Sequence, residues 1–294
     1  MKIRLSENFR AVFYAPFYAT MALGCYAREG LDITFVDSAA PGGGPSGLLD
    51  GTVDVTWGGP MRVMKSRDEN GPDYVCFAEV VRRDPFYLVA KPGAAFTFAD
   101  LPKLGFASVS EVPTPWLCLQ HDLRDLGIDP SILNRIPDRT MGDNLAALAK
   151  GDLDIIQVFE PFAAMAVRQG VGDIVHAASA RGDTAYTTLL SLRSGVEKNR
   201  AAFSAMTRAT RAMQGWLAAH TGADLADAVA SYYPNVARED LVAALTRYKA
   251  ANLWATDTLL SRKGFDRLAV SLQSGGFIRR LPAYDDCVAD PMLE

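Results

Sequence analysis

Two distant stretches of the sequence share one outline. They read LDGTVDVTWGG (Leu49–Gly59) and AKGDLDIIQVF (Ala149–Phe159). In each, a helix-like segment reaches a glycine, Gly51 or Gly151. After one intervening residue come an apolar residue, an aspartate and a β-branched residue. The separation is far longer than the roughly 20–50 residues of a solenoid repeat. The shared outline therefore predicts two similarly built lobes, and two lobes imply a cleft between them.

The size and charge of the chain narrow the classes of protein. Its 294 residues are enough for two α/β lobes, and 49% hydrophobic with 22% charged residues is ordinary for a globular protein. A formal net charge of −4 without a basic run argues against a nucleic-acid partner. No apolar run approaches the ~20 residues of a membrane span, so we expect no direct membrane insertion.

The beginning of the sequence leaves the compartment open. MKIRLSENFR leads at once into charged, strand-like sequence, without the apolar stretch of a secretory signal. Two alternatives remain: an export signal has been removed, or the protein stays in the cytosol.

Cysteines and histidines give no sign of a metal or cofactor site. The four cysteines lack CxxC spacing and are interpreted as buried small hydrophobic residues, with a disulfide as the alternative. The three histidines are far apart and form no HExxH pattern. We therefore expect no metal and no cofactor. The residues are Cys25, Cys76, Cys118, Cys287, His121, His176 and His220.

The order of predicted elements indicates an α/β fold. Short strand-like segments alternate with helical ones up to about residue 90, and the pattern restarts near residue 91. Strands separated by helices are typical of a mixed, mostly parallel sheet flanked by helices in each lobe. From Asn199 onwards nearly everything is helical. We expect lobe one to comprise 1–90 plus 191–294 and lobe two 91–190, with the ligand cleft between them and two crossings that form a hinge.

In open α/β sheets, ligands bind beyond the carboxyl ends of the strands, and this rule selects five segments. Arg10 is either a partner for a ligand carboxylate or a surface residue. The glycine-rich segment PGGGPSG (41–47) either brings backbone amides to a ligand or is only a turn. Trp57 either stacks on a flat ligand or belongs to the core. The candidate ligand-binding residues come from these segments, with Tyr186 added. They are Asn8, Arg10, Phe13, Tyr14, Gly43, Gly44, Ser46, Thr56, Trp57, Gly58, Ser108, Ser110, Trp116, Phe159, Glu160 and Tyr186.

No catalytic set is evident in these segments. There is no GxSxG motif, no Cys–His couple and no dinucleotide fingerprint. An acid–base pair of Glu79 and Glu160 across the cleft is the remaining catalytic interpretation. Glu111 argues against a densely anionic ligand. Hydrogen-bond donors interleaved with aromatic residues indicate a recognition site rather than a reaction centre.

Three elements give the chain a family resemblance. APFYATMALGCYAREGLDITFV is similar to the opening of the NMT1/THI5-like and nitrate/sulfonate/taurine group of ABC transporter substrate-binding proteins. LLDGTVDVTWGG and LAKGDLDIIQVFEPF resemble that group's Gly-x-Val-Asp and Glu-Pro-Phe elements. The resemblance implies a two-lobed, type 2 periplasmic-binding-protein-like fold. It also implies ligand contacts after the first strand, at 43–46, 56–58 and 108–110, and near Glu160.

The resemblance implies a function as well. A protein of this kind closes on a small polar or anionic molecule and presents it to an ABC permease outside the cytoplasm. The aromatic residues among the candidates favour a flat, aromatic or heterocyclic ligand. We expect a monomer without enzymatic activity. The alternative is a cytosolic enzyme of pyrimidine-precursor or aromatic-acid metabolism on the same fold. The cysteine-rich motif of the pyrimidine synthases has no counterpart here, since Cys76 is isolated.

Overall fold

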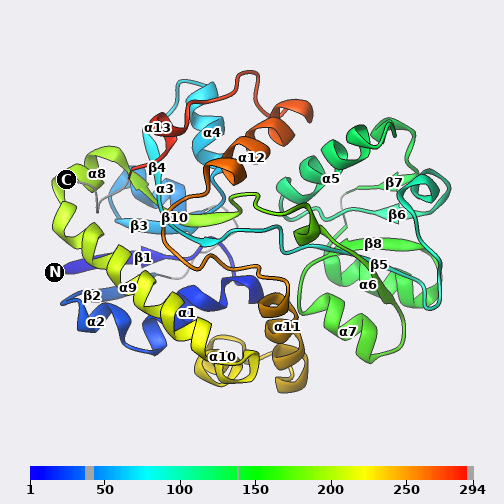
Figure 1. Cartoon of the computed structure of the whole chain (residues 1–294), viewed down its shortest axis with the longest axis horizontal. Helices are drawn as coiled ribbons and strands as arrows, with labels where there is room; N and C mark the ends of the chain where they lie inside the picture. Colours follow the sequence, from blue (N-terminus) through cyan, green and yellow to red (C-terminus); the bar gives the residue numbers. More distant parts are fainter. Residues whose placement is uncertain (37–42, 138, 290–294) are drawn as a thin grey trace.

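The protein contains two five-stranded sheets that lie side by side along its long axis (Figure 1). The computed structural model describes residues 1–36, 43–137 and 139–289. The first sheet has the order β2-β1-β3-β10-β4 and the second β7-β6-β8-β5-β9. We refer to the part built around the first sheet as lobe one and to the part around the second as lobe two.

Each sheet is mixed. In lobe one, β1 pairs in parallel with β2 and β3, and β10 is antiparallel to β3 and β4. In lobe two, β6 pairs in parallel with β7 and β8, and β5 is antiparallel to β8 and β9. The strands are β1 (Lys2–Ser6), β2 (Asp32–Val36), β3 (Val55–Gly58), β4 (Tyr74–Val81), β5 (Tyr87–Ala90), β6 (Phe106–Ala107), β7 (Arg135–Ile136), β8 (Ile155–Val158), β9 (Asp173–Ala177) and β10 (Thr187–Leu192).

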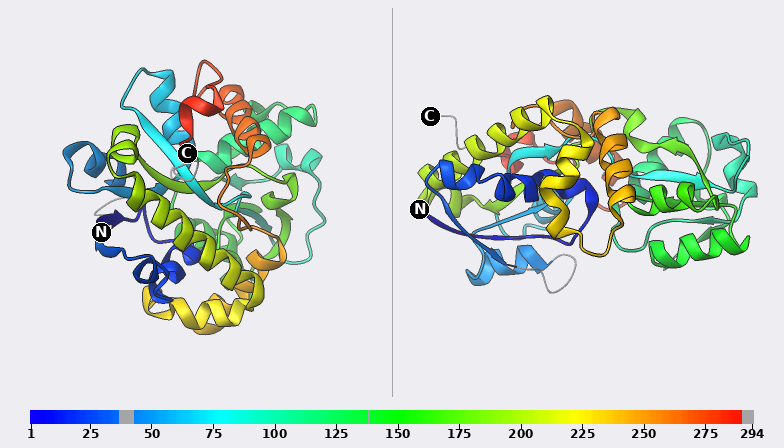
Figure 2. Two further views of the ribbon diagram at one scale, coloured as in Figure 1. Left: turned by 60° about the vertical axis from the view of Figure 1, so that its left-hand side comes forward. Right: turned by 90° about the horizontal axis from the view of Figure 1, so that it is seen from below.

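Helices flank both sheets, and the C-terminal third is helical, as expected (Figures 1 and 2). The helical segment after η1 is divided into α1 and α2 at Gly24, which adopts a left-handed conformation. The α-helices are α1 (Ala15–Ala22), α2 (Cys25–Arg28), α3 (Gly43–Asp50), α4 (Met61–Asp68), α5 (Thr114–Asp125), α6 (Met141–Lys150), α7 (Phe162–Arg168), α8 (Arg193–Lys198), α9 (Arg200–Ala219), α10 (Gly222–Val229), α11 (Arg238–Ala250), α12 (Arg262–Ser274) and α13 (Tyr284–Cys287). Short 3-10 helices are η1 (Val12–Tyr14), η2 (Phe98–Lys103), η3 (Pro130–Ile132), η4 (Ala178–Arg181) and η5 (Ala230–Tyr232).

The two similar sequence stretches form the same substructure in the two lobes. α3 and α6 end at Gly51 and Gly151, which have φ of 74° and 85°, and β3 and β8 follow. Both stretches therefore favour glycine at the helix end, because the backbone is left-handed there.

The shared aspartate binds the neighbouring parallel strand in both lobes. Asp54 accepts a hydrogen bond from the backbone N–H of Arg4 (2.8 Å) and pairs with its guanidinium (2.7 Å). Asp154 accepts one from the N–H of Gly105 (2.8 Å) and pairs with the ammonium of Lys91 (2.6 Å). These basic neighbours hold the pKa of each carboxyl below its usual range.

The chain crosses between the sheets twice, at residues 82–86 and 178–186. By sheet membership, β5 belongs with the second sheet and β10 with the first. A division that follows the sheets thus lies a few residues before the expected positions 90 and 190, and the exact lobe boundaries stay a prediction.

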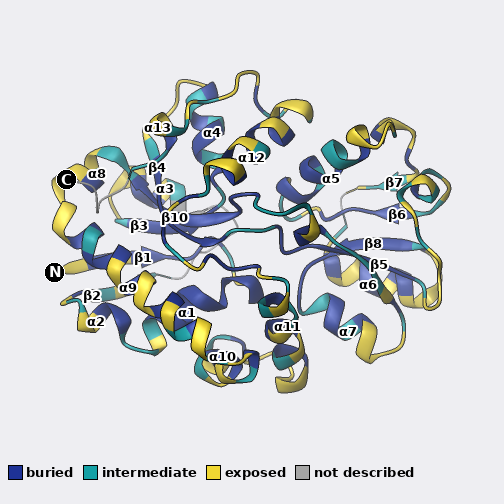
Figure 3. Ribbon diagram, viewed as in Figure 1, coloured by how far each residue is buried: buried dark blue, intermediate teal, exposed yellow. Residues whose placement is uncertain are grey.

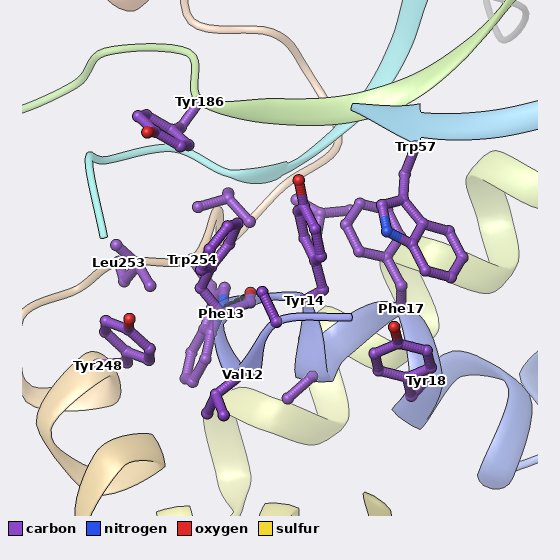
Figure 4. Packing of buried hydrophobic residues seen from close by; sticks show 14 of the residues in the cluster. Val12, Phe13, Tyr14, Phe17, Tyr18, Trp57, Tyr186, Tyr248, Leu253 and Trp254 are labelled. Carbon is purple, nitrogen blue, oxygen red and sulfur yellow. Dashed lines mark hydrogen bonds between the residues drawn. The ribbon is translucent and has the colours of Figure 1, made fainter. Parts of the chain in front are cut away.

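The central strands of both sheets are buried between the helices, whereas the edge strands β2, β7 and β9 are at most partly buried, and the outer faces of the helices are exposed (Figure 3). A large aromatic cluster in lobe one surrounds Trp57, whose ring stacks on that of Phe17 at 4.8 Å between centroids and 8° between planes (Figure 4). In the same view, the indole N–H of Trp254 donates to the carbonyl of Phe13 (2.9 Å). No helix among the described residues is long and apolar enough to cross a membrane.

Candidate functional site

A cavity of about 600 Å³ lies between the lobes. Lobe one contributes the segment after β1 and the segment before α11, and lobe two contributes the residues directly after β8, the first part of α7, the start of α6 and Glu111. These are the strand-end positions where α/β folds bind ligands. The lining residues are Phe9, Arg10, Ala11, Val12, Glu111, Met141, Phe159, Pro161, Phe162, Met165, Tyr232, Tyr233, Pro234, Asn235 and Val236.

The two charged side chains of this cavity are already engaged. Arg10 pairs with the buried carboxylate of Glu7 (2.8 Å) and donates to the carbonyl of Tyr232 (3.4 Å). Glu111 accepts hydrogen bonds from the N–H of Met141 (2.9 Å) at the start of α6 and from that of Ser110 (3.2 Å). The rest of the lining is mainly apolar and aromatic, which suits a ligand with an apolar body.

A second, much smaller cavity of about 30 Å³ also lies between the lobes. It shares Phe9 with the large cavity, and its lining includes the start of α4 from lobe one and the start of α5 from lobe two. The lining residues are Phe9, Phe13, Tyr14, Gly59, Met61, Arg62, Val112, Pro113, Thr114 and Tyr186.

Aromatic rings connect the two lobes beside these cavities. Phe159 of lobe two contacts Phe13 of lobe one edge-on, with 5.2 Å between centroids, and lies 6.3 Å from Phe9. The hydroxyl of Thr114 also donates to the sulfur of Met61 across the lobes (2.7 Å). In this conformation the lobes are therefore in contact around the cavities.

Five of the predicted ligand-binding residues line a cavity: Arg10 and Phe159 the large one, and Phe13, Tyr14 and Tyr186 the small one. Asn8 is buried and accepts a hydrogen bond from Arg62 at 3.4 Å. Ligand contact by these residues stays a prediction.

Other predicted residues have structural surroundings instead. Trp57 is fully buried among aromatic rings, so the core interpretation applies in this conformation, not the stacking one. Glu160 is fully buried, pairs with Arg247 and accepts from the N–H of Ala164 in α7 (2.7 Å). The carboxylate is thus enclosed and already has partners in this conformation, and ligand contact near Glu160 stays a prediction.

Most of the remaining candidates are not among the described residues that line the two cavities. Thr56 donates within the sheet to the carbonyl of Ser6 (3.1 Å), and Ser108 accepts from Arg135 (2.6 Å). Ser110 donates to the carbonyl of Arg139 (2.7 Å), and Trp116 packs on Phe106 in lobe two. Ser46 is exposed on α3 and Gly58 ends β3. Gly43 and Gly44 begin α3, and their surroundings lie outside the described residues.

The structure also shows site residues that sequence reasoning missed. Tyr232–Val236 lie more than 200 positions from the segment that they face, and helical periodicity in the C-terminal third did not reveal their destination. Arg62 was missed because a charged residue early in a helix usually lies on a solvated face. Its place directly after Gly58–Pro60, at the end of a buried strand, was the available signal.

An acid–base pair of Glu79 and Glu160 is not formed. Glu79 pairs with Arg82 (2.7 Å), whereas Glu160 pairs with Arg247. Burial raises the pKa of Glu79 to about 7, with Arg82 opposing the shift. Within the described part of the chain, no group of three or more His, Cys, Asp or Glu side chains could hold a metal ion.

Comparison with known sequences decides the family. Residues 9–232, more than two thirds of the chain, match the NMT1-like family. The chain belongs to the NMT1-like family. The family expected from the sequence is thus confirmed. This NMT1-like protein is also 25% identical to YtlA of Bacillus subtilis (strain 168), whose name marks it as a candidate binding protein. That match covers 100% of this chain and 89% of YtlA.

Solved structures of two binding proteins share the fold of this NMT1-like protein. The alkanesulfonate-binding protein SsuA from Xanthomonas axonopodis pv. citri, bound to MOPS, superimposes with a TM-score of 0.72 at 16% identity and covers 98% of each chain. The periplasmic nitrate-binding protein NrtA from Synechocystis PCC 6803 gives a TM-score of 0.69 at 14% identity, over 97% of this chain and 83% of NrtA. The two-lobed periplasmic-binding-protein fold is therefore confirmed.

Proposed function

We propose that this protein is the substrate-binding component of an ABC-type uptake system and holds a small molecule between its lobes. The observation that carries the proposal is the 600 Å³ cavity, because strand-end segments of both lobes line it. A ligand there touches both lobes and favours the conformation in which they are in contact.

Related proteins support this function. SsuA and NrtA are named as binding proteins, for alkanesulfonate and nitrate respectively, and YtlA carries a binding-protein name. The ligands of SsuA and NrtA are small anions, which accords with a small polar or anionic ligand for this chain. An enzymatic role is less well supported, because Glu79 and Glu160 are each paired with an arginine.

The proposal includes a membrane permease as partner and a location outside the cytoplasm. NrtA is described as periplasmic. A monomer is proposed because the two lobes of one chain already enclose the cavity.

A thermal-unfolding screen of the purified protein tests the proposal. The compounds are small anions, sulfonates, pyrimidines and aromatic acids. A compound that binds only the folded protein stabilises it by about 2.7 kcal/mol at a hundredfold excess over Kd. We expect a stabilising compound that is recovered chemically unchanged after long incubation. A stabilising compound that is consumed would identify an enzyme, and no stabilisation by any compound would contradict a binding role.

A further inference from the structure

Several partly buried arginines of this protein are neutralised by carboxylates, because burying an unpaired charge is costly. The side chains of three such arginines are 10–30% exposed, and each contacts at least one acidic side chain. The pairs are Arg82 with Glu79 and Asp257, Arg181 with Asp84 and Asp122, and Arg247 with Glu160.

Arg62 differs from these three arginines. It is the second residue of α4 and is half-buried, yet no carboxylate among the described residues pairs with it. Its hydrogen-bond partner is the amide oxygen of Asn8, at 3.4 Å. Burial lowers the pKa of the Arg62 guanidinium, and the neighbouring groups that oppose this shift are the phenols of Tyr14 and Tyr74. Among the described residues, the Arg62 guanidinium is thus a partly desolvated positive charge without a carboxylate partner.

The surroundings of Arg62 suit one small anionic group. Arg62 lines the 30 Å³ cavity, and no other charged side chain is among the described residues lining it. Since a water molecule needs about 10–15 Å³ on this measure, the space corresponds to about two oxygen-sized groups. The starts of α4 and α5 both lie at this cavity, one from each lobe, and helix N-termini favour negative charge.

Arg10, the arginine that the sequence favoured, is a poorer candidate for this role. Glu7 already forms two hydrogen bonds with it, at 2.8 and 3.3 Å. The carboxylate of Glu111 also lines the large cavity together with Arg10. A ligand anion at Arg10 would compete with Glu7 and approach Glu111, whereas an anion at Arg62 displaces no carboxylate.

We propose that Arg62 determines the charge of the ligand, and that the ligand is a small organic oxoanion whose single carboxylate or sulfonate group binds at Arg62 between the starts of α4 and α5. The inference rests on the proposed function and adds to it the class of ligand and the residue that selects it. One oxoanion supplies the negative partner that Arg62 lacks, and it joins the two lobes.

Matched pairs of compounds test the inference. Acetate and acetamide, benzoate and benzamide, and benzenesulfonate and benzenesulfonamide differ within each pair mainly in charge. Thermal unfolding and calorimetric titration are measured for the wild type, Arg62→Met, Arg62→Lys and Arg67→Met. Arg67 is a control in the same helix, where it pairs with Asp73. The unfolding temperature without ligand shows that each variant folds.

We expect at least one anion to stabilise the wild type more than its neutral partner. Arg62→Met should lower the affinity for that anion by about tenfold or more, because a charge-assisted hydrogen bond is lost. Arg62→Lys should restore part of the affinity, and Arg67→Met should bind like the wild type. Carboxylates and sulfonates are distinguished by which pair responds.

Three results would overturn the inference: no anion stabilises the wild type, a neutral compound binds as tightly as its anionic partner, or Arg62→Met retains full affinity. Binding of neutral compounds with Arg62→Met unaffected would leave the proposed function standing and remove only the charge selection. Consumption of the bound compound would instead contradict the proposed function.

Discussion

Trp57 lies inside the core of lobe one, with Phe17 and Phe35 stacked near its indole at 4.8 and 5.8 Å between centroids. The side chain is fully buried, and its N–H has no hydrogen-bond partner among the described residues. Its contribution is therefore to packing, and the shape of the ring matters more than the N–H.

We predict that Trp57→Ala lowers the free energy of unfolding by about 3–5 kcal/mol because it leaves a cavity. Trp57→Phe should cost less, since it keeps an aromatic ring among its neighbours and loses an N–H without a partner. Urea unfolding of both variants measures this. If Trp57→Ala unfolds like the wild type but loses ligand affinity, Trp57 is a ligand-stacking residue after all.

At this scale, residue type alone did not reveal the role of a side chain. Glu160 and Arg62 both follow buried strands, so the local sequence predicts similar surroundings for the two side chains. The difference is a tertiary contact: Arg247, 87 positions away, neutralises Glu160, whereas no carboxylate in the described part of the chain pairs with Arg62. Burial and ion pairing depend on contacts with distant segments, and these contacts cannot be predicted from the local sequence.

At the scale of elements, α11 of the C-terminal third packs against α7 of lobe two. Ion pairs join this region to α11: Arg247 pairs with Glu160, which lies just before α7, and Arg168 pairs with Asp240 at 2.7 Å and with Glu239 at 3.5 Å. Glu160 and Asp240 are buried. These ion pairs therefore connect the lobes in addition to the two chain crossings.

We predict that Arg247→Met lowers the free energy of unfolding by about 3–5 kcal/mol, because it leaves the Glu160 carboxylate buried without its cation. Burial already raises the pKa of Glu160, and without Arg247 that pKa rises further. A raised carboxyl pKa in the folded state means that stability is lost as pH increases past the ordinary carboxyl pKa. The deficit should thus be larger at pH 8 than at pH 5.

Arg238→Met is the control for this prediction. Arg238 and its partner Asp227 have side chains 67% and 60% exposed, so that pair contributes little to stability. Urea unfolding of both variants at the two pH values is the measurement. An Arg247→Met deficit as small as that of Arg238→Met, or one independent of pH, would contradict a buried ion pair between α7 and α11.

The elements themselves were largely predictable from the sequence. Apolar periodicity indicated the helices, and the shared outline indicated two equivalent units, which Asp54 and Asp154 complete with equivalent hydrogen bonds. The placement of β5 in the second sheet and β10 in the first was not predictable to the residue. Both are short apolar strands beside a crossing, and their local pattern fits either sheet.

At the scale of the whole molecule, two crossings and the α7–α11 contact connect lobes that enclose a 600 Å³ cavity. The lobes touch through Phe9, Phe13 and Phe159 and through Thr114 with Met61. Separation of these contacts would widen the path between the lobes to the small cavity at Arg62. Binding should therefore couple to opening and closing of the lobes.

We predict that the ligand-free protein populates a second arrangement with the lobes further apart, and that a stabilising compound reduces it. The four native cysteines are at most 2% exposed, so spin labels attach selectively to new cysteines at the exposed positions Glu69 of lobe one and Leu126 of lobe two. Pulsed electron spin resonance then measures the distance between the labels.

We expect a broad or double distribution of label distances without ligand and a single, shorter distance with a stabilising oxoanion. Arg62→Met with the same compound should retain the broad distribution, because the anion no longer bridges the lobes. A single distance in every sample would mean that the lobes are rigid, and ligand entry would then need only side-chain movements around Phe9.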